Sequence, residues 1–201
     1  MRMILVFSIL LTFCMSNSNK NIDTDSTDHN AAKSDSDRVV LYSFPEQGKG
    51  KWRVQDDVVM GGRSDSQLKI TDENYAHFSG HVSLENNGGF CSIHQTVEQY
   101  PYVIAEKSEA FVLIVKGDGK EYNFRVRTPN GRHSYGFTFP TKGGGEWENI
   151  SIPFNAMEAK YHGKPVEVPN YAGENIVEMQ LLIGNKKEQT FEILIKSIEA
   201  V

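Results

Sequence analysis

The chain has 201 residues, of which 39% are hydrophobic and 23% charged, so its length allows one sizeable domain with a packed core. Its net charge of −5 argues against a nucleic-acid binder, because neutralising phosphates requires a basic surface. Seventeen glycines and eleven phenylalanines favour a turn-rich β protein.

Residues 1–14 have the pattern of an export signal. One arginine precedes an apolar run from Met3 to Phe13, which is too short for a transmembrane helix and fits the apolar region of a secretory signal. Cys14 follows in the sequence LTFC, which resembles the acylation site of bacterial lipoproteins. We therefore expect an exported protein of the bacterial cell envelope or periplasm. A lipid anchor on Cys14, an ordinary cleaved signal and an uncleaved anchor remain open alternatives.

Residues 15–38 are mostly Ser, Asn, Asp, Thr and Lys. Such a segment buries too little apolar surface to offset the entropy lost on ordering, so it predicts a disordered tether. The folded domain is then expected over residues 39–201, with membrane contact only through the N-terminal anchor. Cys91 is the one thiol of that domain, which excludes an internal disulfide, and its alternation with Ile93 predicts a buried side chain.

From residue 39 onward, apolar and polar residues alternate as in half-buried antiparallel strands. The segment YNFRVRT places Arg125 and Arg127 on a polar face. The apolar runs AFVLIVK and VEMQLLI are typical of strands buried on both faces. The expected strands are 39–44, 67–71, 76–84, 90–96, 110–116, 122–128, 134–139, 147–153, 177–183 and 191–198, with a helical turn near 155–159. This number of strands, joined by Gly-rich turns, predicts an all-β antiparallel sandwich of two sheets.

The sequence lacks the common motifs of enzymes and cofactor sites, including GxSxG, HExxH, the phosphate loop and the dinucleotide fingerprint. Asp56 and Asp57 are adjacent and point to opposite faces of an extended chain, so they cannot act as a carboxylate pair. Ser64, Ser92 and Ser151 have no recognisable triad setting. We therefore predict a protein that is not an enzyme and needs no metal or cofactor.

Two segments combine unusual chemistry with a glycine pair. WRVQDDVVMGGRSD spans residues 52–65, and SLENNGGFCSI spans residues 83–93. Glycine pairs allow backbone angles closed to other residues and let another chain pack closely. We expect two loops side by side at the rim of the sandwich, with Asn86 or Asn87 bonding the backbone of residues 56–63. Structural bracing and partner binding remain equally open as their role. The candidate binding residues are Asp56, Asp57, Met60, Gly61, Gly62, Arg63, Ser64, Asn86, Asn87, Gly88 and Gly89, together with Arg125 and Arg127.

These segments, in order, resemble one known family. WRVQDDVVMGGRS and FSGHVSLENNGGFCSI, followed by KGDGKEYNFRVRT, YGFTFPT, WENISIPF and FEILIKSIEAV, are similar to the complex I intermediate-associated protein family over nearly all of residues 39–201. The resemblance implies a galactose-binding-like β jelly roll. Mitochondrial members are assembly factors of NADH:ubiquinone oxidoreductase that bind intermediates and are not catalysts.

The expected function is therefore reversible binding of a protein partner, such as an intermediate of a membrane complex. A jelly-roll carbohydrate-binding module is the alternative. It predicts exposed aromatic side chains, Trp52 or surface tyrosines, on a sheet or loop rim.

Overall fold

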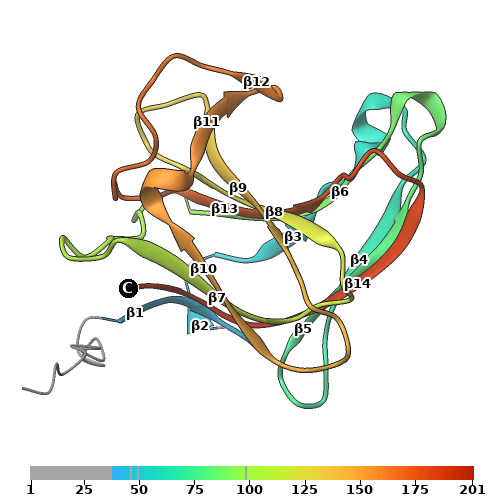
Figure 1. Cartoon of the computed structure of the whole chain (residues 1–201), viewed down its shortest axis with the longest axis horizontal. Helices are drawn as coiled ribbons and strands as arrows, with labels where there is room; N and C mark the ends of the chain where they lie inside the picture. Colours follow the sequence, from blue (N-terminus) through green and yellow to red (C-terminus); the bar gives the residue numbers. More distant parts are fainter. Residues whose placement is uncertain (1–37, 46, 49, 98) are drawn as a thin grey trace, which may run out of the picture. The chain divides into compact units, whose positions relative to one another are not determined.

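The computed structural model describes residues 38–201 except 46, 49 and 98 (Figure 1). The expected export signal, the lipidation site Cys14 and the tether up to residue 37 lie outside the described residues. Within the part of the chain that is described, no helix is long and apolar enough to cross a membrane.

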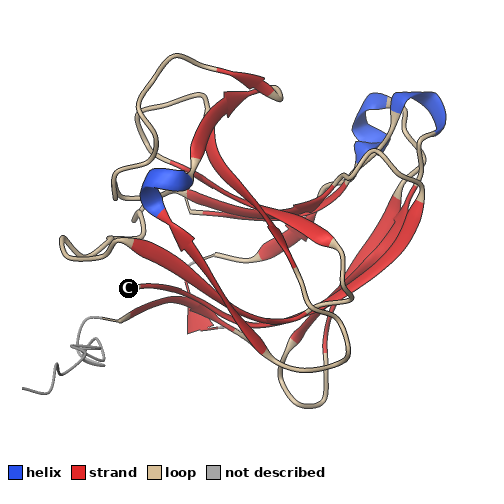
Figure 2. Cartoon of the chain, viewed as in Figure 1, coloured by secondary structure: helices blue, strands red, loops and turns tan. Residues whose placement is uncertain are grey.

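The described residues form two antiparallel sheets that pack against each other, joined by loops with short 3-10 helices (Figure 2). Sheet A contains β10 (Glu148–Pro153), β7 (Ala110–Lys116), β14 (Gln189–Ala200), β1 (Val39–Ser43), β2 (Gln47–Gly48), β5 (Ala76–Val82) and β4 (Asp65–Ile70). Sheet B has the order β12 (Lys164–Pro165), β11 (Glu158–Tyr161), β9 (Ser134–Pro140), β8 (Glu121–Arg127), β13 (Glu178–Ile183), β6 (Cys91–Thr96) and β3 (Trp52–Val54). The 3-10 helices are η2 (Asp57–Met60), η3 (Glu85–Asn87) and η4 (Phe154–Ala156).

Strand β14 organises sheet A because it has neighbours on both edges. β7 pairs along one edge. The other edge pairs with β5 over residues 189–195 and with β1 over residues 197–200. The register of the β7 pairing shifts between Ile195 and Ser197. The alternation of apolar and polar residues determines which side chains form the core. Ile193 and Ile195 of β14 are buried between the sheets, as is Phe124 of β8.

The two-sheet jelly roll expected from the sequence is confirmed, and all ten expected strands are present with boundaries shifted by a few residues. Cys91 is fully buried, as its strand pattern predicted, and burial raises the pKa of its thiol to about 12. Four short strands were not predicted: β2, β3, β11 and β12. The helical turn expected near 155–159 is η4, and it ends at Ala156 because β11 begins at Glu158.

The prediction that VEMQLLI is buried on both faces is wrong. Met179, Leu181 and Ile183 are buried in the core, whereas Gln180 and Leu182 alternate with them and are only partly buried. β13 therefore presents a polar residue on the outer face of sheet B, which is the face turned away from the core.

Candidate functional site

Asp57 is the centre of the glycine-rich rim, which we define as η2, η3 and the residues that follow each of them (57–64 and 85–90). Its carboxylate accepts hydrogen bonds from the Ser64 hydroxyl at 2.5 Å and the Ser64 amide at 3.1 Å. It also accepts the backbone amides of Gly89 at 2.6 Å and Phe90 at 3.2 Å. Burial favours the neutral acid, but these four donors outweigh it and lower the pKa of Asp57. One carboxylate therefore joins the two loops. Their backbones lie side by side in Figure 1.

The glycine pairs leave room for this carboxylate. A Cβ atom on Gly62 would overlap the side chain of Asp57, and one on Gly88 would lie 2.6 Å from the Asp57 Oδ2 atom. Glycine is favoured at position 61 for a different reason. Gly61 caps the end of η2 with a φ of +88°, which is in the left-handed region. The side-by-side arrangement of the loops agrees with the sequence prediction. The bonding differs from it, because Asp57 binds the backbone of the second loop, instead of Asn86 or Asn87 binding the first.

Asp56 points away from Asp57 and fastens the rim to the sheets. Its carboxylate accepts the Ser66 hydroxyl at 2.7 Å and the Ser92 amide at 3.2 Å. Burial raises the pKa of Asp56 despite these bonds. The two acids thus act on opposite sides of the chain, as expected for adjacent residues in an extended segment.

The prediction that all the candidate binding residues of the rim face a partner is corrected by the burial of three of them. Asp56, Asp57 and Ser64 are buried and bonded internally, so they brace the loops and cannot meet a partner directly. The exposed candidates are Gly61, Arg63, Asn86 and Asn87, whereas Gly62, Gly88 and Gly89 are partly buried. Met60 lies in η2, and its side chain is outside the described part of the structure. Arg63 forms an exposed ion pair of 3.1 Å with Glu85, which links the two loops at their surface.

The outer face of sheet B carries the other two candidates, Arg125 and Arg127 of β8. Register partners on neighbouring strands share a face, so the pairing places one continuous row of side chains across the sheet. This row, which we call the central row, runs through Arg53, His94, Gln180, Arg125, Gly136 and Glu158. A polar row therefore crosses six strands on the side away from the core.

Glu178 lies beside the central row and holds its polar groups in place. Its carboxylate bonds the His94 Nδ1 atom at 2.8 Å, the Arg127 Nε atom at 2.8 Å and the Gln180 amide at 3.1 Å. Burial alone would raise the pKa of Glu178, but the bonds from His94 and Arg127 prevail and lower it to about 2. Arg127 is thus already neutralised by an acid within the protein.

Ser92, His94 and Glu178 form a chain that resembles a catalytic triad. The Ser92 Oγ atom lies 3.0 Å from the His94 Nε2 atom, and the opposite ring nitrogen contacts Glu178. Ser92 is fully buried, however, and its hydroxyl also bonds the Gln55 carbonyl oxygen. A nucleophile must reach its substrate, so this arrangement supports a structural network that fixes the imidazole.

Arg125 and Arg53 differ from Arg127 in having no acidic partner among the described residues. The Arg125 Nε atom donates to the Asn123 side chain at 2.5 Å, and burial lowers the pKa of this guanidinium. Arg125 lies next to Gly136, where a Cβ atom would come within 3.1 Å of the Arg125 side chain. Arg53 is exposed, and its side chain bonds one described group, the Thr96 hydroxyl at 3.3 Å. Both arginines keep guanidinium donors available to a ligand.

Aromatic side chains do not contribute to the outer face of sheet B in the strands that the structure describes. None of the described strand residues on the outer face of sheet B is Trp, Tyr or Phe. Trp52 packs against the core, 5.8 Å from the ring of Tyr42, and Trp147 packs 4.6 Å from the ring of Tyr75. The surface is therefore suited to charge and hydrogen bonding more than to stacking.

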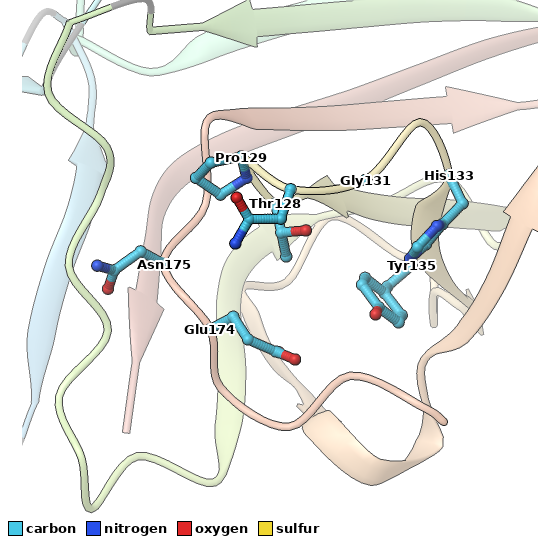
Figure 3. Close-up of a pocket in the computed structure, with 8 residues that line it drawn as sticks. Thr128, Pro129, Gly131, His133, Tyr135, Glu174 and Asn175 are labelled. Carbon is cyan, nitrogen blue, oxygen red and sulfur yellow. The ribbon is translucent and has the colours of Figure 1, made fainter. Parts of the chain in front are cut away.

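A cavity of about 350 Å³ lies beyond the end of β8, between the β8–β9 turn and the segment before β13. Figure 3 shows Glu174 extending toward Tyr135, with Thr128 and His133 on the neighbouring turn. Burial and the nearby Glu174 carboxylate raise the pKa of Tyr135. Within the described residues, no group of three His, Cys, Asp or Glu side chains could hold a metal ion.

The sequence reasoning identified Arg125 and Arg127 but missed Arg53, His94, Glu178 and Gln180. His94 alternates with the buried Cys91 and Ile93 positions in a pattern that could have placed it on the outer face. Glu178 and Gln180 were hidden because VEMQLLI reads as a continuous apolar run. Their proximity to Arg127 and His94 depends on the order of the strands, which the local sequence does not contain.

Known proteins support this fold and give the family. A Clostridium thermocellum family 11 carbohydrate-binding module in complex with a β-1,3-1,4-mixed-linked tetrasaccharide superposes with a TM-score of 0.58 and 14% identity, covering 82% of this chain and 95% of the module. An uncharacterized protein of Schizosaccharomyces pombe is 27% identical over 183 residues, which covers 81% of this chain and 84% of that protein.

The mouse mitochondrial protein named complex I intermediate-associated protein 30 is 27% identical over 154 residues, covering 65% of this chain and 45% of the mouse protein. The match thus includes less than half of the mouse protein's length. The family model described as Complex I intermediate-associated protein 30 (CIA30) matches residues 42–195. Because this match includes most of the folded unit, the chain belongs to the CIA30 family, as its motifs predicted.

Proposed function

We propose that this protein is a non-enzymatic binding protein that docks a protein partner on the outer face of sheet B. The observation that carries the proposal is the pair Arg53 and Arg125, two arginines with unused donors on one rigid sheet face. Interface centres are enriched in arginine, and a rigid surface loses little entropy on binding. The exposed rim residues Arg63, Asn86 and Asn87 would form a second contact area.

Family membership supports an intermediate of a membrane complex as the partner. The mouse relative is named for its association with complex I intermediates, and the family model spans both glycine pairs and β8. A lipid anchor on Cys14, at the end of the export signal, and a tether in residues 15–38 would hold the domain close to a membrane surface, where such an intermediate could be reached.

A carbohydrate ligand is the alternative, and the chemistry of the face supports it less. Sugar-binding surfaces commonly use exposed aromatic rings, which this outer face lacks in its described strands. The likeness to the family 11 module is at 14% identity and concerns the fold.

Site-specific photo-cross-linking in the full-length protein tests the docking face. A photoreactive phenylalanine at Thr138, exposed on β9 of sheet B, should capture a partner protein from membranes. The same group at Ser151, exposed on β10 of sheet A, is the matched control and should capture much less. Mass spectrometry of the adduct identifies the partner. Equal capture from both positions, or saturable binding of the protein to a neutral glycan on an array, would contradict the proposal.

A further inference from the structure

The outer face of sheet B carries both paired and unpaired charges. Glu178 is compensated by Arg127 at 2.8 Å, and Glu158 lies 3.1 Å from the Lys160 ammonium. Glu121 is at the outer end of β8, four residues from Arg125. Arg53 and Arg125 form no ion pair with a described carboxylate. Two unpaired arginines against Glu121 leave the net uncompensated charge of this face positive, although the chain as a whole has a net charge of −5.

The partly buried position of Arg125 strengthens the electrostatic attraction between its guanidinium and an incoming negative charge. Its guanidinium is partly buried next to Gly136, and desolvation lowers its pKa. A partly desolvated cation interacts more strongly with an anion than an exposed cation does, because the local dielectric constant is lower. Guanidinium groups also bind carboxylates in a bidentate geometry. A carboxylate is thus the group that would best complete this site.

The register fixes the distance between the two cations. Arg53 and Arg125 lie in the central row and are separated by the three strand steps from β3 through β6 and β13 to β8. At about 4.8 Å for each step, their backbones are roughly 14 Å apart. An extended peptide advances about 3.3 Å per residue, so roughly four residues span the same distance. Gln180 and His94 lie between the two arginines, under the middle of such a peptide.

We propose that the outer face of sheet B binds an acidic, extended segment of a protein partner that crosses the strands, with one carboxylate on Arg53 and a second, four residues along, on Arg125. This inference rests on the proposed function and specifies the chemistry of its partner. The Glu178 network keeps the intervening side chains in place before binding, which reduces the entropy lost on association.

Peptide binding to the full-length protein tests the proposal directly. The probe is the synthetic peptide Gly-Glu-Ser-Thr-Ser-Glu-Gly, measured by calorimetry at low salt. Replacing both glutamates with glutamine should weaken binding at least about tenfold, since each carboxylate loses a charge-assisted pair. A peptide with the same charge but adjacent glutamates, Gly-Ser-Glu-Glu-Ser-Thr-Gly, should also bind about fivefold to tenfold more weakly, because it cannot reach both arginines.

Matched variants separate the site from general charge attraction. Arg53→Gln and Arg125→Gln should each weaken binding of the spaced peptide about tenfold, whereas Arg132→Gln, an exposed arginine off the sheet face, should leave it unchanged. As a control, the unfolding curve of each variant is measured to check that the fold is retained. An equal loss in Arg132→Gln, or equal affinity for the two glutamate peptides, would overturn the proposal.

Two further results distinguish this inference from the proposed function. If the double variant Arg53→Gln/Arg125→Gln still captures its partner through position 138, docking on the face stands and the acidic segment is wrong. If polygalacturonate binds more tightly than the spaced peptide and its binding requires both arginines, the ligand is an anionic glycan, which overturns both the acidic protein segment and the protein partner.

Discussion

The rim and the outer face of sheet B use polar residues in opposite ways. In the rim, the carboxylate of Asp57 is buried and its four donors all come from the protein itself. On the face, Glu178 satisfies Arg127, but Arg125 and Arg53 keep donors for which no described carboxylate is close. A satisfied polar group stabilises the fold, and one that is left unsatisfied next to solvent is available for binding. Substitutions should therefore separate stability from binding by region.

The largest effect is expected at the centre of the rim. Asp57→Ala removes the acceptor of four hydrogen bonds and leaves buried amides without partners, so it should lower the free energy of unfolding by about 3–5 kcal/mol. Urea unfolding measures the change. Asp65→Ala, at an exposed acid at the start of β4, is the control and should change stability by less than about 0.5 kcal/mol. A similar loss in both variants would show that Asp57 does not hold the loops together.

Glycine substitutions sharpen the same point by separating steric overlap from backbone strain. Gly62→Ala places a methyl group into the Asp57 carboxylate and should cost about 2–3 kcal/mol. Gly61→Ala has open space around its Cβ position but a φ of +88°, so it should cost only about 1 kcal/mol. Thermal unfolding of the two variants should give the larger decrease in Tm for Gly62→Ala. The reverse order would contradict the packing described for the rim.

Acid titration tests the part of the face that is internally satisfied. The pKa of Glu178 is about 2 in the folded protein against an ordinary value of 4.5, so its charge stabilises the fold above pH 4.5 and this contribution is lost as the pH falls toward 2. Glu178→Gln should cost on the order of 2–3 kcal/mol at pH 7. The difference in unfolding free energy between wild type and variant should shrink between pH 4.5 and pH 2. A difference that is constant over this range would exclude a lowered pKa.

The smallest stability effect belongs to the binding arginines. Arg53→Gln and Arg125→Gln each break one hydrogen bond to a neighbouring side chain and should change the unfolding free energy by about 0.5 kcal/mol or less. Partner capture through position 138 should nevertheless decrease strongly in the double variant. If these variants unfold as readily as Asp57→Ala, the division between a bracing region and a binding region is wrong.

The period-two alternation in segments such as YNFRVRT was enough to predict the strands and the two-sheet sandwich. It also placed Arg125 and Arg127 on the outer face correctly, because the direction of a side chain in a strand depends only on its position. The short strands were missed because alternation can be recognised only over several residues. β3 and β12 have three and two residues, which is too short to show a period.

The function of the rim acids was harder to predict, because it depends on contacts between distant residues. Asp57 and Gly89 are 32 positions apart and meet only when both loops are folded. Polar composition alone suggested an exposed binding loop, while the glycine pairs indicated close packing. The second signal was the correct one, since Gly62 and Gly88 lie directly against the buried carboxylate.

The position of β14 has a consequence for how the molecule forms. It is the last strand of the described chain, yet it pairs with β5, whose Val82 meets Gln189, and with β1, whose Val39 meets Ala200. On the ribosome, the edges of β1, β5 and β7 that β14 will cover stay open until almost the whole domain has been synthesised. Loop closure over such long separations makes folding slow, in the range of about milliseconds to seconds, and leaves those edges exposed to aggregation in the meantime.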